Sequence, residues 1–171
     1  NRPDQALAFS PDGRTLAAGN STGHNADVYL VDTRSHRQTA YAQSGPARWA
    51  TPDVLFSPDG RTLVTGEILA YPPSGPLPGP PPEVIVNRNP VNARARIQSA
   101  PLREGHLIGF VDHGRELLVT TGEASSILLD ARTLQRVRSL GFGGIAAVSP
   151  HGKLAAFGRP NGSVVLFDLQ T

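Results

Sequence analysis

Short apolar runs separated by turn residues recur along the whole chain. In four places an apolar run leads into a turn that contains glycine, and a second apolar run follows at once. Proline and aspartate favour the start of such a turn, and glycine supplies the positive φ that closes it. Each place is therefore predicted to be a β-hairpin between two buried strands. The segments are 7–16, 55–63, 109–117 and 147–154, with Gly13, Gly60, Gly114 and Gly152 in their turns.

A third run, rich in β-branched and aliphatic residues, follows each hairpin and ends on a polar residue, as expected of a strand. A fourth, more polar strand is expected three times, because alternating arginines such as Arg94 and Arg96 are typical of an edge strand. No stretch of ten residues has helical periodicity, so the sequence predicts an all-β fold. The expected third strands are 28–32, 84–88, 127–130 and 164–168, and the expected fourth strands lie around 37–42, 93–98 and 135–140.

The turn segments 10–16 and 57–63, both Ser-Pro-Asp-Gly-Arg-Thr-Leu, resemble the first hairpin of a WD repeat. Segment 164–171 resembles the third strand of that repeat with its Trp-Asp ending, Phe167 standing in place of tryptophan, and Gly105-His106 resembles the Gly-His pair that opens a repeat. The turn glycines are 47, 54 and 38 residues apart, which brackets the roughly 40–45 residues of a WD-type blade. This resemblance to the WD-repeat family and its bacterial relatives implies a β-propeller with four blades of antiparallel strands. The blades are expected at about 5–43, 52–99, 105–140 and 144–171.

The chain departs from the strongest members of that family. Arg88 stands where the other expected third strands end on aspartate, and no repeat carries the full His–Ser/Thr–Asp–Trp set. Similar Pro-Asp-Gly turns occur in TolB-like and YVTN-type propellers. A ring usually has about four to eight blades, and no fourth strand follows segment 164–168. We therefore expect part of a larger propeller, or a propeller completed by a second copy of the chain.

The composition, 39% hydrophobic and 18% charged, is that of a folded protein, and no apolar run reaches the ~20 residues that span a bilayer. The formal net charge is only +2, so neither nucleic acid nor a membrane is an expected partner. Without cysteine, and with five histidines that lack ligand spacing, no metal or other cofactor is expected. A cytoplasmic location is expected, because a chain without disulfides is compatible with a reducing compartment.

Residues that recur at the same place in each repeat are interpreted as structural, because carboxylates and hydroxyls there can cap backbone N–H groups. The run 19–23 matches the Gly-x-Ser-x-Gly nucleophile elbow, but that elbow needs a strand-to-helix turn and a strand is expected next. No catalytic residue is therefore predicted. The recurring residues are Asp32, Asp130 and Asp168 at strand ends and Ser10, Ser57 and Ser149 in turns.

Segments that do not recur supply the candidates for function. Segment 71–83 holds seven of the sixteen prolines and interrupts the second blade, and proline cannot donate to a ladder, so a loop is expected there. In a propeller this loop lies on the same face as the connections between blades. Partly exposed Trp and Arg on that face are frequent binding anchors. The candidate partner-binding residues are Arg48, Trp49, Tyr71, Arg103, His106 and Arg159.

The leading hypothesis is a non-enzymatic protein-interaction scaffold, a propeller module of a larger bacterial regulatory or signalling protein. This context comes from the resemblance, because a fold does not fix a function. The mostly apolar first strands, 6–9 and 145–148, disfavour ionisable channel chemistry. A ligand-binding or catalytic propeller of the TolB-like or YVTN type and a purely structural oligomerisation element stay open. The expected partner is a protein, with a homodimer as a way to complete the ring.

Overall fold

The computed structural model describes residues 5–21, 26–45, 53–69, 83–90, 98–103, 106–121 and 125–169. Backbone alone is described for 5–6, 20–21, 26, 40–45, 67–69, 83–90 and 98–103. The chain divides into two compact units, Asn1–Arg103 and Glu104–Thr171. The candidates Arg48, Trp49 and Tyr71, together with the Pro-rich segment up to residue 82, lie outside the described residues.

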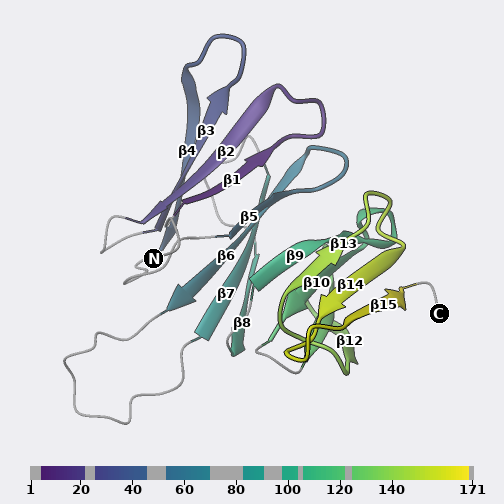
Figure 1. Ribbon diagram of the computed structural model, residues 1–171. Helices are drawn as coiled ribbons and strands as arrows, with labels where there is room; N and C mark the ends of the chain where they lie inside the picture. The colour runs from purple at the N-terminus through teal and green to yellow at the C-terminus, as the bar shows by residue number, and fades with distance from the viewer. Residues whose placement is uncertain are drawn as a thin grey trace, which may run out of the picture. The chain divides into compact units, whose positions relative to one another are not determined.

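The first unit contains two four-stranded sheets, and in each the strands follow one another in chain order (Figure 1). Sheet A consists of β1 Gln5–Phe9, β2 Thr15–Ser21, β3 Ala26–Asp32 and β4 Gln38–Gly45. Sheet B consists of β5 Asp53–Phe56, β6 Thr62–Leu69, β7 Glu83–Pro90 and β8 Gln98–Arg103.

The second unit repeats this construction with a four-stranded and a three-stranded sheet. Sheet C consists of β9 His106–Val111, the short 3-10 turn η1 Asp112–Gly114, β10 Glu116–Thr120, β11 Ser126–Asp130 and β12 Arg136–Leu140. Sheet D consists of β13 Ala146–Val148, β14 Leu154–Gly158 and β15 Val164–Asp168.

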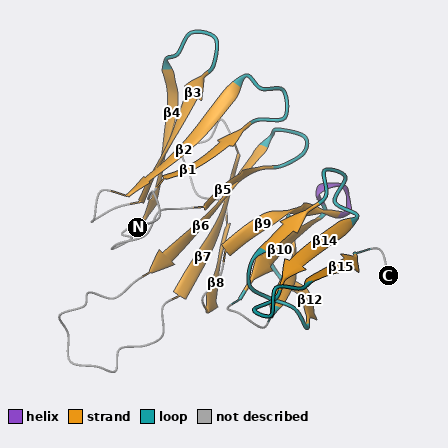
Figure 2. Cartoon of the chain, viewed as in Figure 1, coloured by secondary structure: helices purple, strands orange, loops and turns teal. Residues whose placement is uncertain are grey.

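All four sheets are antiparallel, and no α-helix occurs in the described parts of the chain (Figure 2). The all-β class is therefore confirmed. The hairpins form at the Ser-Pro-x-Gly turns because the glycine there has positive φ, +69° at both Gly13 and Gly60 and +67° at Gly152. The strands that follow are rich in Val, Leu and Ile, whose side chains suit a pleated surface covered on both faces.

The third strand of sheet B is longer than predicted. β7 runs on to Pro90, and the register pairs Pro90 with Thr62, just as Asp32 pairs with Thr15 in sheet A. Pro90, and not Arg88, therefore occupies the position of the strand-ending aspartate. Because proline has no N–H, Pro90 cannot donate the backbone hydrogen bond that the strand-ending aspartate donates in sheet A.

The edge strand of sheet B also differs from the prediction. β8 covers Gln98–Arg103, where 93–98 was expected. The alternation of Arg94 and Arg96 suggested the earlier position, but alternation alone does not set the register of a strand. Residues 93–97 lie outside the described part of the chain. The pairing of Glu83 with Arg103 sets the true register.

A core lies between the two sheets of the first unit. The first strands, β1 and β5, are neighbours, and buried side chains from both sheets meet there. Successive side chains of a strand point to opposite faces, so Leu7 and Phe9 lie on the far side of sheet A, where they are 63% and 65% exposed. The core residues are Ala17, Val28, Leu30, Val54 and Leu63, with Ala8 and Phe56 packed against them.

The second unit has a matching core between sheets C and D. Its first strands, β9 and β13, are neighbours, and Gly109 allows their close approach because a Cβ there would lie 3.3 Å from the Val148 side chain. Phe142 stacks on the buried Phe157 with ring centroids 5.7 Å apart. The buried residues are Val111, Leu118, Leu128, Leu140, Ala155, Phe157 and Leu169.

Each sheet has two distinct ends. The turn end carries the turn between the first two strands and, in sheets A and C, the turn between the last two; the connection end is the opposite one. The turn ends of sheets C and D meet, because the Asp112 N–H donates to the Gly152 carbonyl at 3.3 Å. The starts of β9 and β13 therefore share the connection end of the second unit.

Removal of the Phe157 ring tests the second core. Phe157 is 1% exposed and packs against Phe142, so we expect Phe157→Ala to lower the free energy of unfolding by about 3–5 kcal/mol. Val137→Ala, at a side chain that is 51% exposed, is the control and should cost under about 0.5 kcal/mol. Urea unfolding followed by circular dichroism measures both. Equal midpoints for the two variants would contradict the assigned core.

Candidate functional site

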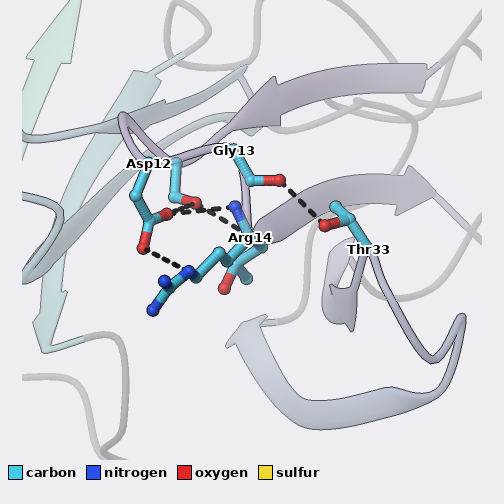
Figure 3. A network of polar contacts seen from close by, with 6 residues as sticks. Asp12, Gly13, Arg14 and Thr33 are labelled. Carbon is cyan, nitrogen blue, oxygen red and sulfur yellow. Dashed lines mark hydrogen bonds and ion pairs between the residues drawn. The ribbon is translucent and has the colours of Figure 1, made fainter.

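The first turn of sheet A is held by a polar network (Figure 3). The Ser10 hydroxyl donates to the Asp12 carboxylate at 2.6 Å and accepts the Thr15 N–H at 2.9 Å. The same carboxylate oxygen accepts the Arg14 N–H at 3.0 Å. These bonds, with the Gly13 N–H donating to the Ser10 carbonyl at 2.8 Å, satisfy the polar groups of a tight turn. The recurring serine and aspartate therefore stabilise the hairpin.

Sheets B and D repeat this turn with one difference. In sheet B the Ser57 hydroxyl donates to Asp59 at 2.5 Å and accepts the Thr62 N–H at 3.0 Å. In sheet D the Ser149 hydroxyl accepts the Leu154 N–H at 3.0 Å, but His151 stands in the place of the aspartate. The turn of sheet D therefore lacks the carboxylate that stabilises the other two.

The hydrogen bonds also lower the pKa of these aspartates. The Ser10 hydroxyl is the largest cause of the lowered pKa of Asp12, followed by the Arg14 N–H. The Ser57 hydroxyl has the same effect on the pKa of Asp59. Hydrogen-bond donors to a carboxylate stabilise its charged form, so the folded chain favours the ionised form of both aspartates.

A second recurring turn follows β3 and β11. The Asp32 carboxylate accepts the Ser35 N–H at 2.6 Å, and the Asp130 carboxylate accepts the Thr133 N–H at 2.7 Å. These backbone bonds are the largest cause of the lowered pKa of both aspartates. The next residue, Leu134 after Thr133, has a φ of +55°, a left-handed conformation that the capped turn stabilises.

Backbone bonds connect the two kinds of turn within a sheet. The residue after the strand-ending aspartate donates its N–H to the carbonyl of the basic residue in the first turn. The three pairs are Thr33 to Arg14 at 3.0 Å, Ala131 to Arg115 at 2.8 Å and Leu169 to Lys153 at 2.9 Å. In sheet A the Thr33 hydroxyl also donates to the Gly13 carbonyl at 2.8 Å (Figure 3). The turn end is thus built from its recurring residues.

The run that matches a nucleophile elbow is described only from Gly19 to Ser21. Gly19 and Ser21 lie within β2, and the next described element is the strand β3, which begins at Ala26. A nucleophile elbow requires a helix after the strand. The part of this run that is described is therefore ordinary antiparallel strand.

The predicted partner-binding residues that are described lie at connection ends. Arg103 is the last residue of β8 and pairs with Glu83 at the start of β7, which places its backbone at the connection end of sheet B. His106 opens β9 and is exposed, and Arg159 directly follows β14 and is exposed. The second unit therefore brings His106 and Arg159 to one end, as the topology predicted.

Arg159 lies on an aromatic surface. Its guanidinium is 5.5 Å from the centre of the Phe142 ring, within the range of a cation–π interaction. The turn that presents it is closed by the Arg159 N–H donating to the Ser163 carbonyl at 2.9 Å. Beside it, the Ile145 carbonyl accepts the Gly158 N–H at 2.9 Å, and the Ile145 side chain is 79% exposed. We call Phe142, Ile145 and Arg159 the connection-end patch.

Phe142 and Ile145 were not predicted as site residues. The run from Gly141 to Gly144 has no strand or helix period, so nothing in the pattern sets the direction of its side chains. The available signal is a single aromatic residue between glycines, directly before an apolar strand. Only the packing of Phe142 on Phe157 shows that the ring is fixed and that it can support an arginine.

The described residues contain no group of three or more His, Asp or Glu side chains that could hold a metal ion. Among them there is also no helix with the length and apolar character needed to cross a membrane.

Comparison with known proteins reveals a fold. No protein-family model matches the chain, and no curated protein matches its sequence. Among solved structures, the hydrazine synthase of Kuenenia stuttgartiensis is similar, with a TM-score of 0.73 and 18% sequence identity. The similarity covers 95% of this chain and 57% of that chain, so the sequence spans little more than half the length of the matched structure. The WD-repeat resemblance stays a prediction.

The contact between the turn ends of sheets C and D is tested at Gly152. A Cβ on Gly152 would lie 2.9 Å from the Val111 Cα, whereas a Cβ on Gly162 meets no atom within 4 Å; both glycines have positive φ. We expect Gly162→Ala to cost about 1–2 kcal/mol for the left-handed backbone alone. Gly152→Ala should cost about 1–3 kcal/mol more, because the turn must move away. Chemical denaturation measures both, and equal costs would contradict the close approach.

The turn carboxylates are tested through the pH dependence of stability. The pKa of Asp12 is lower in the folded chain than its ordinary value of 3.8, so its stabilisation is present above that value and is lost as pH falls through the lowered pKa. We expect Asp12→Asn to lower the melting temperature at pH 7 and to weaken its decrease below about pH 4. His151→Asp supplies the missing carboxylate in sheet D and should raise the melting temperature at pH 7. If the melting temperatures of wild type and Asp12→Asn change with pH in parallel, this role of Asp12 is refuted.

Proposed function

We propose that the four sheets are consecutive blades of a β-propeller that acts as a non-enzymatic platform for a protein partner. Within each unit the sheets stack face to face with their first strands adjacent, which is the arrangement of neighbouring blades. The similarity to a solved structure at a TM-score of 0.73 supports a common repeat architecture. Because this chain spans 57% of that chain, the platform is proposed as one module of a longer protein.

The division of labour among polar residues supports a binding role. The recurring Ser and Asp side chains are engaged in turn hydrogen bonds, so they serve the hairpins and are not arranged around a reacting group. Arg159 is different, because it is not a recurring residue of the repeat, is exposed and lies over an aromatic ring. Arginine beside aromatic and aliphatic surface is frequent among residues that dominate binding energy. The connection-end patch is the observation that carries the proposal.

The rigidity of the patch favours recognition of a preformed surface. Phe142 packs on Phe157 and lies 5.7 Å from the Phe167 ring, so the ring under Arg159 is anchored in the core. A guanidinium held over a ring loses less conformational freedom on binding than one in solution. The fitting partner presents a carboxylate or backbone carbonyl to Arg159 and an apolar side chain to Ile145.

An affinity capture experiment tests the platform. We expect Arg159→Ala to raise the dissociation constant of the captured partner about tenfold or more. Truncation of a central anchor residue commonly costs over about 1.4 kcal/mol of binding free energy. Lys153→Ala is the matched control: it removes an exposed basic side chain at the turn end, where only the Lys153 carbonyl contributes to the fold. Binding is measured by titration of the purified partner. Equal affinities for both variants would remove the patch from the proposal.

A further inference from the structure

The turn between β14 and β15 contains Asn161, Gly162 and Ser163, all of them exposed. This is the only place in the sequence where glycine directly follows asparagine. Because glycine has no Cβ, its backbone nitrogen is less hindered than that of any other residue in an approach to the preceding amide side chain. The turn also belongs to the surroundings of the connection-end patch, since Arg159 lies two residues before Asn161.

The side-chain amide of Asn161 is held with two donors at its oxygen. Its Oδ1 accepts the Ser163 N–H at 3.0 Å and the Ser163 hydroxyl at 2.7 Å. When a nucleophile adds to the amide carbon Cγ, negative charge develops on this same oxygen. Donors that are already in place at such an oxygen lower the barrier to addition. The turn therefore activates the Asn161 amide as an electrophile.

The nucleophile that lies nearest along the chain is the backbone nitrogen of Gly162. A Cβ at Gly162 would meet no atom within 4 Å, so the space around this residue is open. The Gly162 N–H donates to the Arg159 carbonyl at 3.0 Å, and this bond must break before the nitrogen can attack. The backbone of Gly162, with a φ of +82°, can leave its turn conformation without a steric penalty. The reaction is therefore slow but open to the folded chain.

We propose that Asn161 is a site of intramolecular deamidation in the folded protein. The Gly162 nitrogen loses its proton and bonds to Cγ of Asn161, the Cγ–Nδ2 bond breaks, and ammonia leaves with a proton. The resulting succinimide ring then takes up one water molecule. Opening of the bond between Cγ and the Gly162 nitrogen gives aspartate, and opening of the bond at the backbone carbonyl carbon gives isoaspartate. Either product carries a carboxylate that the asparagine lacked.

Both products act on the connection-end patch. A carboxylate two residues from Arg159, in the same turn, attracts the guanidinium and lowers the positive potential that an acidic group of a partner meets. Isoaspartate also adds a methylene group to the backbone of a turn that the Arg159 N–H closes on the Ser163 carbonyl at 2.9 Å. The loss of partner affinity that follows rests on the proposed function, whereas the deamidation itself does not.

Peptide mapping by mass spectrometry tests the reaction on the full chain kept folded in mildly alkaline buffer. The wild type should accumulate aspartate and isoaspartate at position 161. Asn161→Ser is the control without an amide, and its hydroxyl can keep the turn. Gly162→Ala should slow the conversion in the folded chain and in the urea-unfolded chain alike, because a Cβ hinders the nitrogen in both.

Ser163→Ala tests the contribution of the turn, because it removes the hydroxyl donor and leaves the backbone N–H. In the folded chain it should slow the conversion about fivefold, the effect of about one hydrogen bond. In the urea-unfolded chain, where the turn is absent, it should leave the rate unchanged. Circular dichroism shows that each variant is folded before incubation. A folded wild type without product at position 161, or equal rates for wild type and Ser163→Ala in the folded chain, overturns the proposal.

The link to the patch is read from the NMR signal of the Arg159 side-chain Nε–H. The Phe142 ring shifts this signal because the guanidinium lies 5.5 Å from the ring centre, and Phe142→Ala gives the position without the ring. In the deamidated chain the signal should move toward that position. An unchanged signal contradicts the link. No readout uses a partner, so failure here is distinct from failure of the platform.

Discussion

The hydrogen-bonded turn between the first two strands of each repeat is the constraint on which the rest of the structure depends. The Ser10 hydroxyl, bonded to Asp12 and Thr15, fixes where the hairpin reverses and so sets Phe9 opposite Leu16. The side-chain period of a strand is two, so a slip by one residue would move every apolar side chain to the other face. The same turn at Ser57 and Ser149 gives sheets B and D the same register, and that is why their faces correspond residue by residue.

Register then determines how many faces must be covered. Neighbouring residues of β10, Leu117 and Leu118, are both fully buried although they point to opposite sides of sheet C. A strand that is apolar on both sides cannot end a stack without exposing one side to water. Sheets A and D have this property and each keeps one apolar face exposed. Strands that are apolar on both sides therefore favour stacking of sheets, as occurs within each of the two units.

The sequence was sufficient to locate the hairpins and the third strands, because those depend on local rules, but it did not predict that β7 runs on to Pro90. A glycine with positive φ and a β-branched run recur together, and the strand predicted at 164–168 is β15. The edge strand of sheet B could not be placed, since the alternation of Arg94 and Arg96 carries no register and the pairing of Glu83 with Arg103 is non-local. The same limit applies to the site. Arg159 was predicted from topology, but its support on Phe142 depends on packing that no spacing rule contains.

Repetition also separates the residues that stabilise the fold from those free to acquire a function. A side chain needed in every turn, such as Asp32 or Asp130, cannot change in one repeat without loss of that turn's capping bonds. Where the repeat is already broken, as with His151 in the place of an aspartate, the turn of sheet D keeps its serine bond and tolerates the loss. The connection end carries no such requirement, because its segments differ in length and sequence between repeats. Arg159 lies there over the ring of Phe142, which is itself packed on Phe157, and no hairpin requires this contact. We therefore propose that the contact serves recognition of a partner and not the repeat.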